Sequence, residues 1–121
     1  MGVGMPADMY LHEFGSQVWH GFGTPPYHVG SSLTLKSGWR DVDVRLILND
    51  EEYEAWELGK PDLARHNGKW VALCMAFSAL GNHMTGLPID FQIQQQTWAN
   101  AKFPREHPRS ALGGVALRIV P

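Results

Sequence analysis

Residues 39–48, which read WRDVDVRLIL, place an apolar side chain at every second position from Val42 to Leu48 and constrain the fold more than any other stretch. In a β-strand, residues two apart share a face and lie roughly 6–7 Å apart along the chain. The alternation therefore predicts a strand that buries its valines and leucines on one face. Asp41 and Asp43 should project together from the other face. Two carboxylates held that close repel each other and are costly to bury without a partner, and a divalent cation is the simplest compensation.

Composition limits the class of protein. The 121 residues suffice for one domain with a hydrophobic core, with 44% hydrophobic and 18% charged residues. The net charge of −2 gives no basic footprint for nucleic acid, so duplex DNA is not an expected partner. The single cysteine, Cys74, lies in an apolar run, which favours a reducing compartment. No apolar run reaches the ~18 residues of a membrane span, and no secretion signal begins the chain. We expect one cytoplasmic domain over residues 1–121 with no membrane partner.

Before this strand, the sequence predicts a helix over residues 7–22 and a short strand over residues 27–29. Apolar side chains recur in the helix at steps of three and four residues, at Met9, Tyr10, Phe14, Val18, Trp19 and Phe22. Glycines and prolines end this helix. Gly30 and Ser31 then form a turn, and residues 32–36 form one helical turn.

After the strand, Asn49 and Glu52 resemble a capping box for a short helix that ends near Leu58. A longer helix is predicted over residues 69–80, with an extension back towards Pro61 and with Gly81 at its C-terminal cap. Its expected buried stripe comprises Trp70, Leu73, Cys74, Phe77 and Leu80. A loop over residues 82–87 then leads into a second alternating strand, residues 88–94. Residues 97–110 are expected to be irregular with one helical turn, and residues 115–120 to form a last strand.

The predicted fold class is α+β, with a small mixed sheet and helices packed in a second layer on one face. In residues 88–94 the apolar side chains must face the helices, which places Asp90 on the open face with Asp41 and Asp43. If the two strands are neighbours, the three aspartates converge, flanked by Arg45 and Gln92. Hard oxygen ligands suit Mg²⁺. The sequence has no cysteine or histidine spacing typical of a zinc site.

These residues together resemble a known signature. Gly30-Ser31, a gap of nine residues, Asp41-Val42-Asp43 between apolar flanks and a later Asp90 are similar to the nucleotidyltransferase motif of the DNA polymerase beta superfamily. In size the chain is most similar to the minimal nucleotidyltransferases of prokaryotes. The resemblance covers about residues 7–96 as a catalytic core and leaves residues 97–121 as a tail. It implies a nucleotidyltransferase-like fold.

The resemblance also implies a role for each motif residue. Gly30 would let the backbone approach a nucleoside triphosphate, which is the donor substrate, and Ser31 would bind its β- and γ-phosphates. Asp41 and Asp43 would hold one Mg²⁺ on the nucleotide and, with Asp90, a second Mg²⁺ at the attacking group. Asp90 would also be the candidate base. Arg45 would either neutralise the aspartates or contact a phosphate.

The implied reaction transfers a nucleoside monophosphate from ATP or another triphosphate to an acceptor hydroxyl and releases pyrophosphate. The acceptor would be a small molecule, a protein or an RNA end. Larger relatives carry a further acceptor-binding domain, and the chain ends before one. We therefore expect residues 97–121, with the basic segment 102–109, a second copy in a homodimer or a partner protein to complete the acceptor site.

Two alternatives remain open from the sequence. In the first alternative, the chain is a catalytically silent nucleotidyltransferase-like binding module, for instance an antitoxin-like partner of another protein. Alternatively, the aspartates are only the solvated face of an exposed strand in a small structural domain.

Overall fold

The computed structural model of the chain describes residues 2–104 and 107–113. Its centre is an open sheet of four strands in the order β3-β2-β1-β4. The strands are β1 (Tyr27–Val29), β2 (Val42–Leu48), β3 (Ile89–Gln95) and β4 (Ser110–Ala111). The β2–β3 pair is parallel, and β1 pairs antiparallel with both β2 and β4. The predicted α+β class with a small mixed sheet is confirmed.

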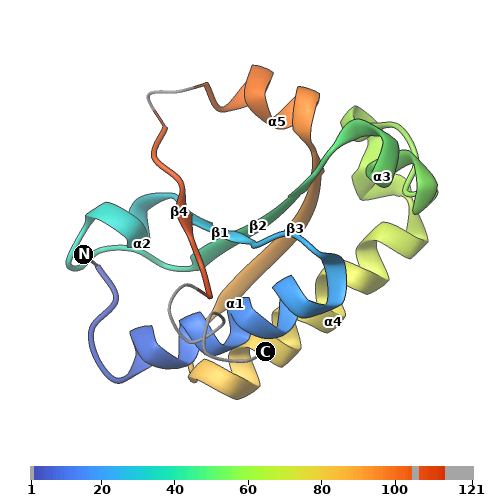
Figure 1. Cartoon of the computed structure of the whole chain (residues 1–121). Helices are drawn as coiled ribbons and strands as arrows, with labels where there is room; N and C mark the ends of the chain where they lie inside the picture. The colour runs from blue at the N-terminus through green and yellow to red at the C-terminus, as the bar shows by residue number, and fades with distance from the viewer. Residues whose placement is uncertain (1, 105–106, 114–121) are drawn as a thin grey trace.

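Helices cover one face of this sheet, and α1 and α4 lie side by side beneath it (Figure 1). The helices are α1 (Ala7–Phe22), α2 (Ser31–Thr34), α3 (Asp50–Ala55), α4 (Gly68–Thr85) and α5 (Gln96–Lys102), with the 3₁₀ helix η1 (Pro61–His66) before α4. None of these helices in the described ranges is long and apolar enough to cross a membrane.

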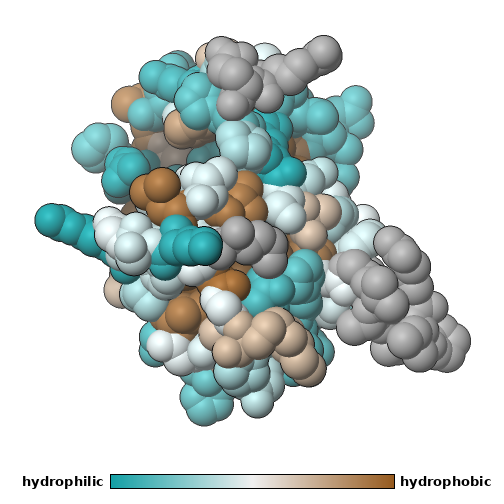
Figure 2. Space-filling model, turned by 90° about the vertical axis from the view of Figure 1, so that its left-hand side faces the viewer, coloured by the Kyte–Doolittle hydropathy of each residue, from teal (hydrophilic) through white to brown (hydrophobic). Residues whose placement is uncertain are grey.

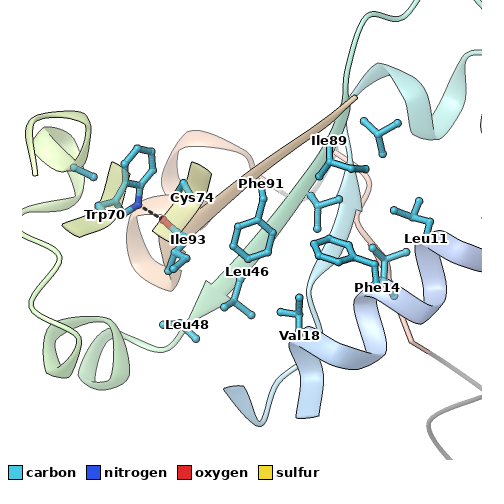
Figure 3. Close-up of a cluster of buried hydrophobic side chains, with 14 of the residues drawn as sticks. Leu11, Phe14, Val18, Leu46, Leu48, Trp70, Cys74, Ile89, Phe91 and Ile93 are labelled. Carbon is cyan, nitrogen blue, oxygen red and sulfur yellow. Dashed lines mark hydrogen bonds between the residues drawn. The ribbon is translucent and has the colours of Figure 1, made fainter. Parts of the chain in front are cut away.

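The hydrophobic core lies between β2, β3 and the two long helices (Figure 3). Leu46 of β2 and Phe91 of β3 are almost fully buried, and the ring of Phe14 from α1 meets that of Phe91 edge-on at 6.1 Å. The Trp70 indole Nε1 of α4 donates a 2.8 Å hydrogen bond to the Ile93 carbonyl of β3. This bond satisfies a buried polar atom and fixes α4 on the sheet.

The predicted elements before Asn49 are largely confirmed. The helix over residues 7–22 and the strand over residues 27–29 have the predicted bounds. The Asn49 side chain accepts a hydrogen bond from the Glu52 amide at 2.8 Å, as a capping box requires, but the return bond to Glu52 Oε1 at 2.8 Å comes from the Asn49 side-chain amide and not from its backbone N–H. The second strand begins only at Val42 rather than at Trp39, so Asp41 precedes the strand.

The buried stripes of both long helices were predicted only in part. In α1, Leu11 is fully buried, whereas the predicted Met9 and Tyr10 are 51% and 43% exposed. The buried residues Leu11, Phe14, Gly15 and Val18 follow the i, i+3, i+4, i+7 spacing of one helix face, and the predicted stripe omitted Leu11 and Gly15. In α4, Leu80 is 39% exposed and Gly81 is buried in its place.

The predicted end of α4 is wrong. The helix continues past Gly81 to Thr85 and is capped by Gly86, which has a left-handed φ of 73°. Gly81 packs inside the helix, because a Cβ there would lie within 3.0–3.1 Å of the Ile89 and Phe14 side chains. The expected loop over residues 82–87 is therefore mostly helix, and the extension towards Pro61 is the separate helix η1.

The segment after β3 is more regular than predicted. Residues expected to be irregular form α5, and β4, which was not predicted, pairs with β1. In Figure 1, α5 lies on the side of the sheet opposite α1 and α4, and β4 then runs along β1 back towards α1. The predicted strand over residues 115–120 lies outside the described residues.

Figure 2 views the molecule from the side that carries α2. Apolar surface there forms small areas separated by hydrophilic residues. Single exposed apolar side chains of this kind are normal and identify no docking face.

Candidate functional site

Side-chain alternation leaves a row of polar residues on the open face of the sheet. Val42, Val44 and Leu46 of β2 are fully buried, so Asp43 and Arg45 face away from the helices. Residues on β3 follow the same pattern. The parallel register places Asp43 opposite Asp90, Arg45 opposite Gln92 and Ile47 opposite Gln94. The predicted placement of Asp43 and Asp90 on one face, with Arg45 and Gln92 beside them, is confirmed.

Arg45 joins the two aspartates. Its Nη2 lies 3.3 Å from Asp90 Oδ2 and 3.7 Å from Asp43 Oδ1. Its Nη1 donates to the backbone carbonyls of Asp90, at 2.6 Å, and of Val44, at 3.2 Å. The Arg45 side chain is only 13% exposed, so its guanidinium has little freedom to turn towards a ligand. Of the two predicted roles of Arg45, the contacts match neutralisation of the carboxylates.

The charged form of Asp43 remains unfavourable despite its contact with Arg45. Burial raises the pKa of the Asp43 carboxyl above its ordinary value of 3.8, and the charges of Asp90 and Asp41 raise it further. The attraction of Arg45 lowers the pKa but does not reverse the shift. One guanidinium therefore contacts two carboxylates, with the charge of Asp41 acting from further away, and this corner of the sheet favours additional positive charge.

Gly30 and Ser31 begin α2 directly beside this corner. Gly30 has a φ of 79°, which favours glycine, and a Cβ at this position would collide with the Asp43 carboxylate. Below the turn, His28 Nε2 and the buried Ser32 hydroxyl are 2.7 Å apart. Burial lowers the pKa of His28, so the imidazole is held neutral as a hydrogen-bond partner. The turn is thus anchored to β1 and packed against Asp43.

Asp41 is the predicted site residue that lies apart. It is exposed and precedes β2, although its charge contributes to the raised pKa of Asp43. Within residues 2–104 and 107–113, no group of three His, Cys, Asp or Glu side chains is arranged to hold a metal. The paired carboxylates of Asp43 and Asp90 are hard oxygen donors that suit Mg²⁺ in chemistry. Arg45 lies against both of them, so a bound cation would have to share them with the guanidinium.

A cleft of about 380 Å³ extends from this corner along the open face. Its floor is formed by the sheet residues Asp43, Arg45, Ile47 and Gln94, and the turn at Gly30 and Ser31 closes one end. The segment between α5 and β4 supplies the opposite wall, with Phe103, His107, Pro108 and Arg109. The volume is typical of a small-molecule site.

The residues of this wall were only partly anticipated. The segment 102–109 was expected to take part in acceptor binding on its basic charge, and no individual residue of it was assigned. Arg109 donates to Asn100 Oδ1 at 2.9 Å and to the Phe103 carbonyl at 2.9 Å, so it ties the end of α5 to β4. Gln94 was noted only as a polar position of its strand. The alternation of polar and apolar residues over 88–94 was the one sequence signal that placed Gln94 on the open face of the sheet.

No protein-family model, no curated protein and no solved structure matches this chain.

Proposed function

We propose that the chain is a Mg²⁺-dependent nucleotidyltransferase, which moves a nucleoside monophosphate from a nucleoside triphosphate to an acceptor hydroxyl in the cytoplasm. One observation carries the proposal. Asp43 and Asp90 are direct neighbours in the parallel register, and the Gly30–Ser31 turn packs against Asp43 at the end of a cleft. The order of turn, α2 and β2 agrees with the signature that these residues resemble.

The proposed roles follow from this arrangement. The Gly30 backbone and the Ser31 hydroxyl hold the β- and γ-phosphates beside Asp43. Asp43 and Asp90 bind Mg²⁺, and Asp41 joins them by a side-chain movement from its exposed position. When bound, Mg²⁺ would neutralise charge that develops on the transferred phosphoryl group. Arg45 is a positioning residue, because it fixes the rotamers of both carboxylates.

Asp90 is the proposed base. Its side chain is 41% exposed, compared with 28% for Asp43, and an acceptor arriving from solvent reaches it more easily. The acceptor oxygen forms a bond to the α-phosphorus while the bond to the bridging oxygen breaks. Pyrophosphate leaves, and Asp90 takes the proton of the acceptor hydroxyl. The acceptor remains a small molecule, a protein or an RNA end, held by the wall beyond α5, a second copy or a partner protein.

Calorimetry with ATP, CTP, GTP and UTP, each with and without Mg²⁺, tests the proposal together with an assay of pyrophosphate release. We expect Mg²⁺-dependent binding of at least one triphosphate. Asp43→Asn and Asp90→Asn should weaken the Mg²⁺-dependent part of binding and stop release. Glu13→Gln, on the exposed side of α1, is the matched control and should change neither. The proposal fails if no triphosphate binds, or if both aspartate variants bind like the native chain.

The arginine contacts favour a second candidate, a catalytically silent binding module of the same fold. Because Arg45 already lies 3.3 Å from Asp90 and 3.7 Å from Asp43, the carboxylates have a partner without any metal. Such a module would release no pyrophosphate with any nucleotide, and Mg²⁺ would not change its thermal stability. Mg²⁺-dependent pyrophosphate release that disappears in Asp43→Asn would exclude it.

A further inference from the structure

The two ends of the cleft differ in chemistry. At one end lie the Gly30–Ser31 turn and Asp43, which under the proposed function hold phosphates and metal. At the other end, Ile47 and Phe103 lie near the buried amide of Gln94, and His107 and Arg109 of the wall add further polar groups. Asp43 and Ile47 are four residues apart on β2, which places them about 13 Å apart along the strand. The cleft is long enough to take a nucleotide lengthwise, with its phosphates at the turn.

Gln94 is unusual for a residue on the open face. It is only 5% exposed, because the segment after β3 covers it. Its amide nitrogen makes a long hydrogen bond of 3.4 Å to Gln92 Oε1, and the described residues provide no other side-chain hydrogen bond to this amide. The Gln94 amide therefore has one weak partner and is not orphaned, and a buried amide gains stability from stronger partners. A ligand with a complementary edge would provide them.

We infer that Gln94 is the residue that selects the base of the donor nucleotide, and that the base is adenine. A glutamine amide presents a donor and an acceptor side by side and pairs in a bidentate way with the amino group and ring nitrogen of adenine. Phe103, 43% exposed at the cleft wall, offers an aromatic face for the base, and Ile47 supplies the apolar floor. A flat ring with one hydrogen-bonding edge matches this end of the cleft.

This inference rests on the proposed function for the direction in which the nucleotide lies, and it is tested separately with nucleosides, which carry no phosphate. Titrations of the full chain use adenosine, guanosine, cytidine and uridine without Mg²⁺. We expect adenosine to bind roughly tenfold to a hundredfold more tightly than the other three, which corresponds to one good bidentate pair.

Two comparisons identify Gln94 as the source of the preference. Gln94→Met keeps the length and apolar contacts of the side chain and should bind all four nucleosides with similar, weak affinity. Purine riboside, which is adenosine without its amino group, should bind the native chain roughly tenfold to a hundredfold more weakly than adenosine does. This second comparison holds even if the variant does not fold. Phe103→Ala should weaken all four nucleosides by a similar factor, because stacking is largely indifferent to the base.

The outcomes separate this inference from the proposed function. Equal affinity for all four nucleosides, or an adenosine preference that survives Gln94→Met, overturns the inference. The inference is also overturned if purine riboside binds as tightly as adenosine. If pyrophosphate is released equally from all four triphosphates, the proposed function stands and the inference falls. Adenosine binding that depends on Gln94, without pyrophosphate release from ATP, supports the inference and contradicts the proposed function.

Discussion

Gly30 is constrained in two ways that substitution can separate. Its φ of 79° strains any residue with a Cβ, and that Cβ would also collide with the Asp43 carboxylate. We expect Gly30→Ala to lower the free energy of unfolding by roughly 1–3 kcal/mol. Gly38→Ala is the matched control, since Gly38 has a φ of 85° but nothing lies within 4 Å of its Cβ position. Urea unfolding should show the smaller loss for Gly38→Ala.

A double variant shows whether the collision with Asp43 accounts for the difference. In an Asp43→Ala background the carboxylate is absent, so Gly30→Ala should cost less than in the native chain and retain only the strain of its φ of 79° and ψ of −168°. If Gly30→Ala costs the same in both backgrounds, the turn does not pack against Asp43 as described.

At the residue scale, alternation alone predicted which carboxylates share the open face. Asp43 and Asp90 lie on it because the strands must bury their apolar side chains against α1 and α4. The same argument does not apply to Asp41, because β2 begins only at the next residue. Side-chain alternation fixes the direction of residues within a paired strand and not of those before it. The cleft wall at Phe103 depends on tertiary packing of a distant segment, and local pattern carries no information about that.

At the element scale, Asp50 connects two helices. It is the first residue of α3, and its carboxylate accepts hydrogen bonds from the Thr97 amide at 3.1 Å and hydroxyl at 2.5 Å, at the start of α5. These bonds lower the pKa of Asp50 below its ordinary value of 3.8. A lowered folded-state pKa stabilises the fold above the ordinary value, and this stability is lost as the pH falls through the folded-state value. We therefore expect Asp50→Asn to be less stable than the native chain at neutral pH, with the difference shrinking in acid.

Asp43→Asn is a control of opposite sign. Because burial raises the pKa of Asp43, the native carboxyl contributes stability in acid that is lost as the pH rises through the raised value. Asp43→Asn should gain stability relative to the native chain towards neutral pH. Urea midpoints measured across the acid range compare both variants. Curves that shift in the same direction for both would contradict the contacts described for these residues.

The elements themselves were predicted where a local device marks their limits. The Asn49 cap and the prolines after α1 act through their nearest neighbours, and the end of α1 and the start of α3 are as predicted, whereas α3 ends at Ala55 and not near Leu58. The end of α4 was wrongly predicted at Gly81, because a glycine near the end of an apolar stripe can either cap a helix or let another element approach it closely. Only the position of Ile89 on β3 decides between these roles. Strand β4 has two residues, too few for a periodic signal.

At the scale of the whole molecule, the segment after β3 is held on by α1 as well as by the sheet. Leu112 is 1% exposed and donates from its amide to the Pro26 carbonyl at 2.9 Å, and the Gly113 amide donates to His12 Nδ1 at 3.2 Å. The contact depends on Gly15, because a Cβ there would collide with Leu112. This packing argues that the wall of the cleft is an integral layer of the domain and not a loose tail.

Two glycines of α1 test this arrangement. An exposed Gly→Ala change inside a helix stabilises by up to about 1 kcal/mol. Gly21 has nothing within 4 Å of its Cβ position, so Gly21→Ala should raise the melting temperature. In Gly15→Ala the same gain is outweighed by displacement of Leu112, so the melting temperature should fall, and limited proteolysis should cut the chain between α5 and β4 sooner. Equal stabilisation by both variants would mean that the segment does not pack on α1. The cleft would then lack the wall on which the adenine inference depends.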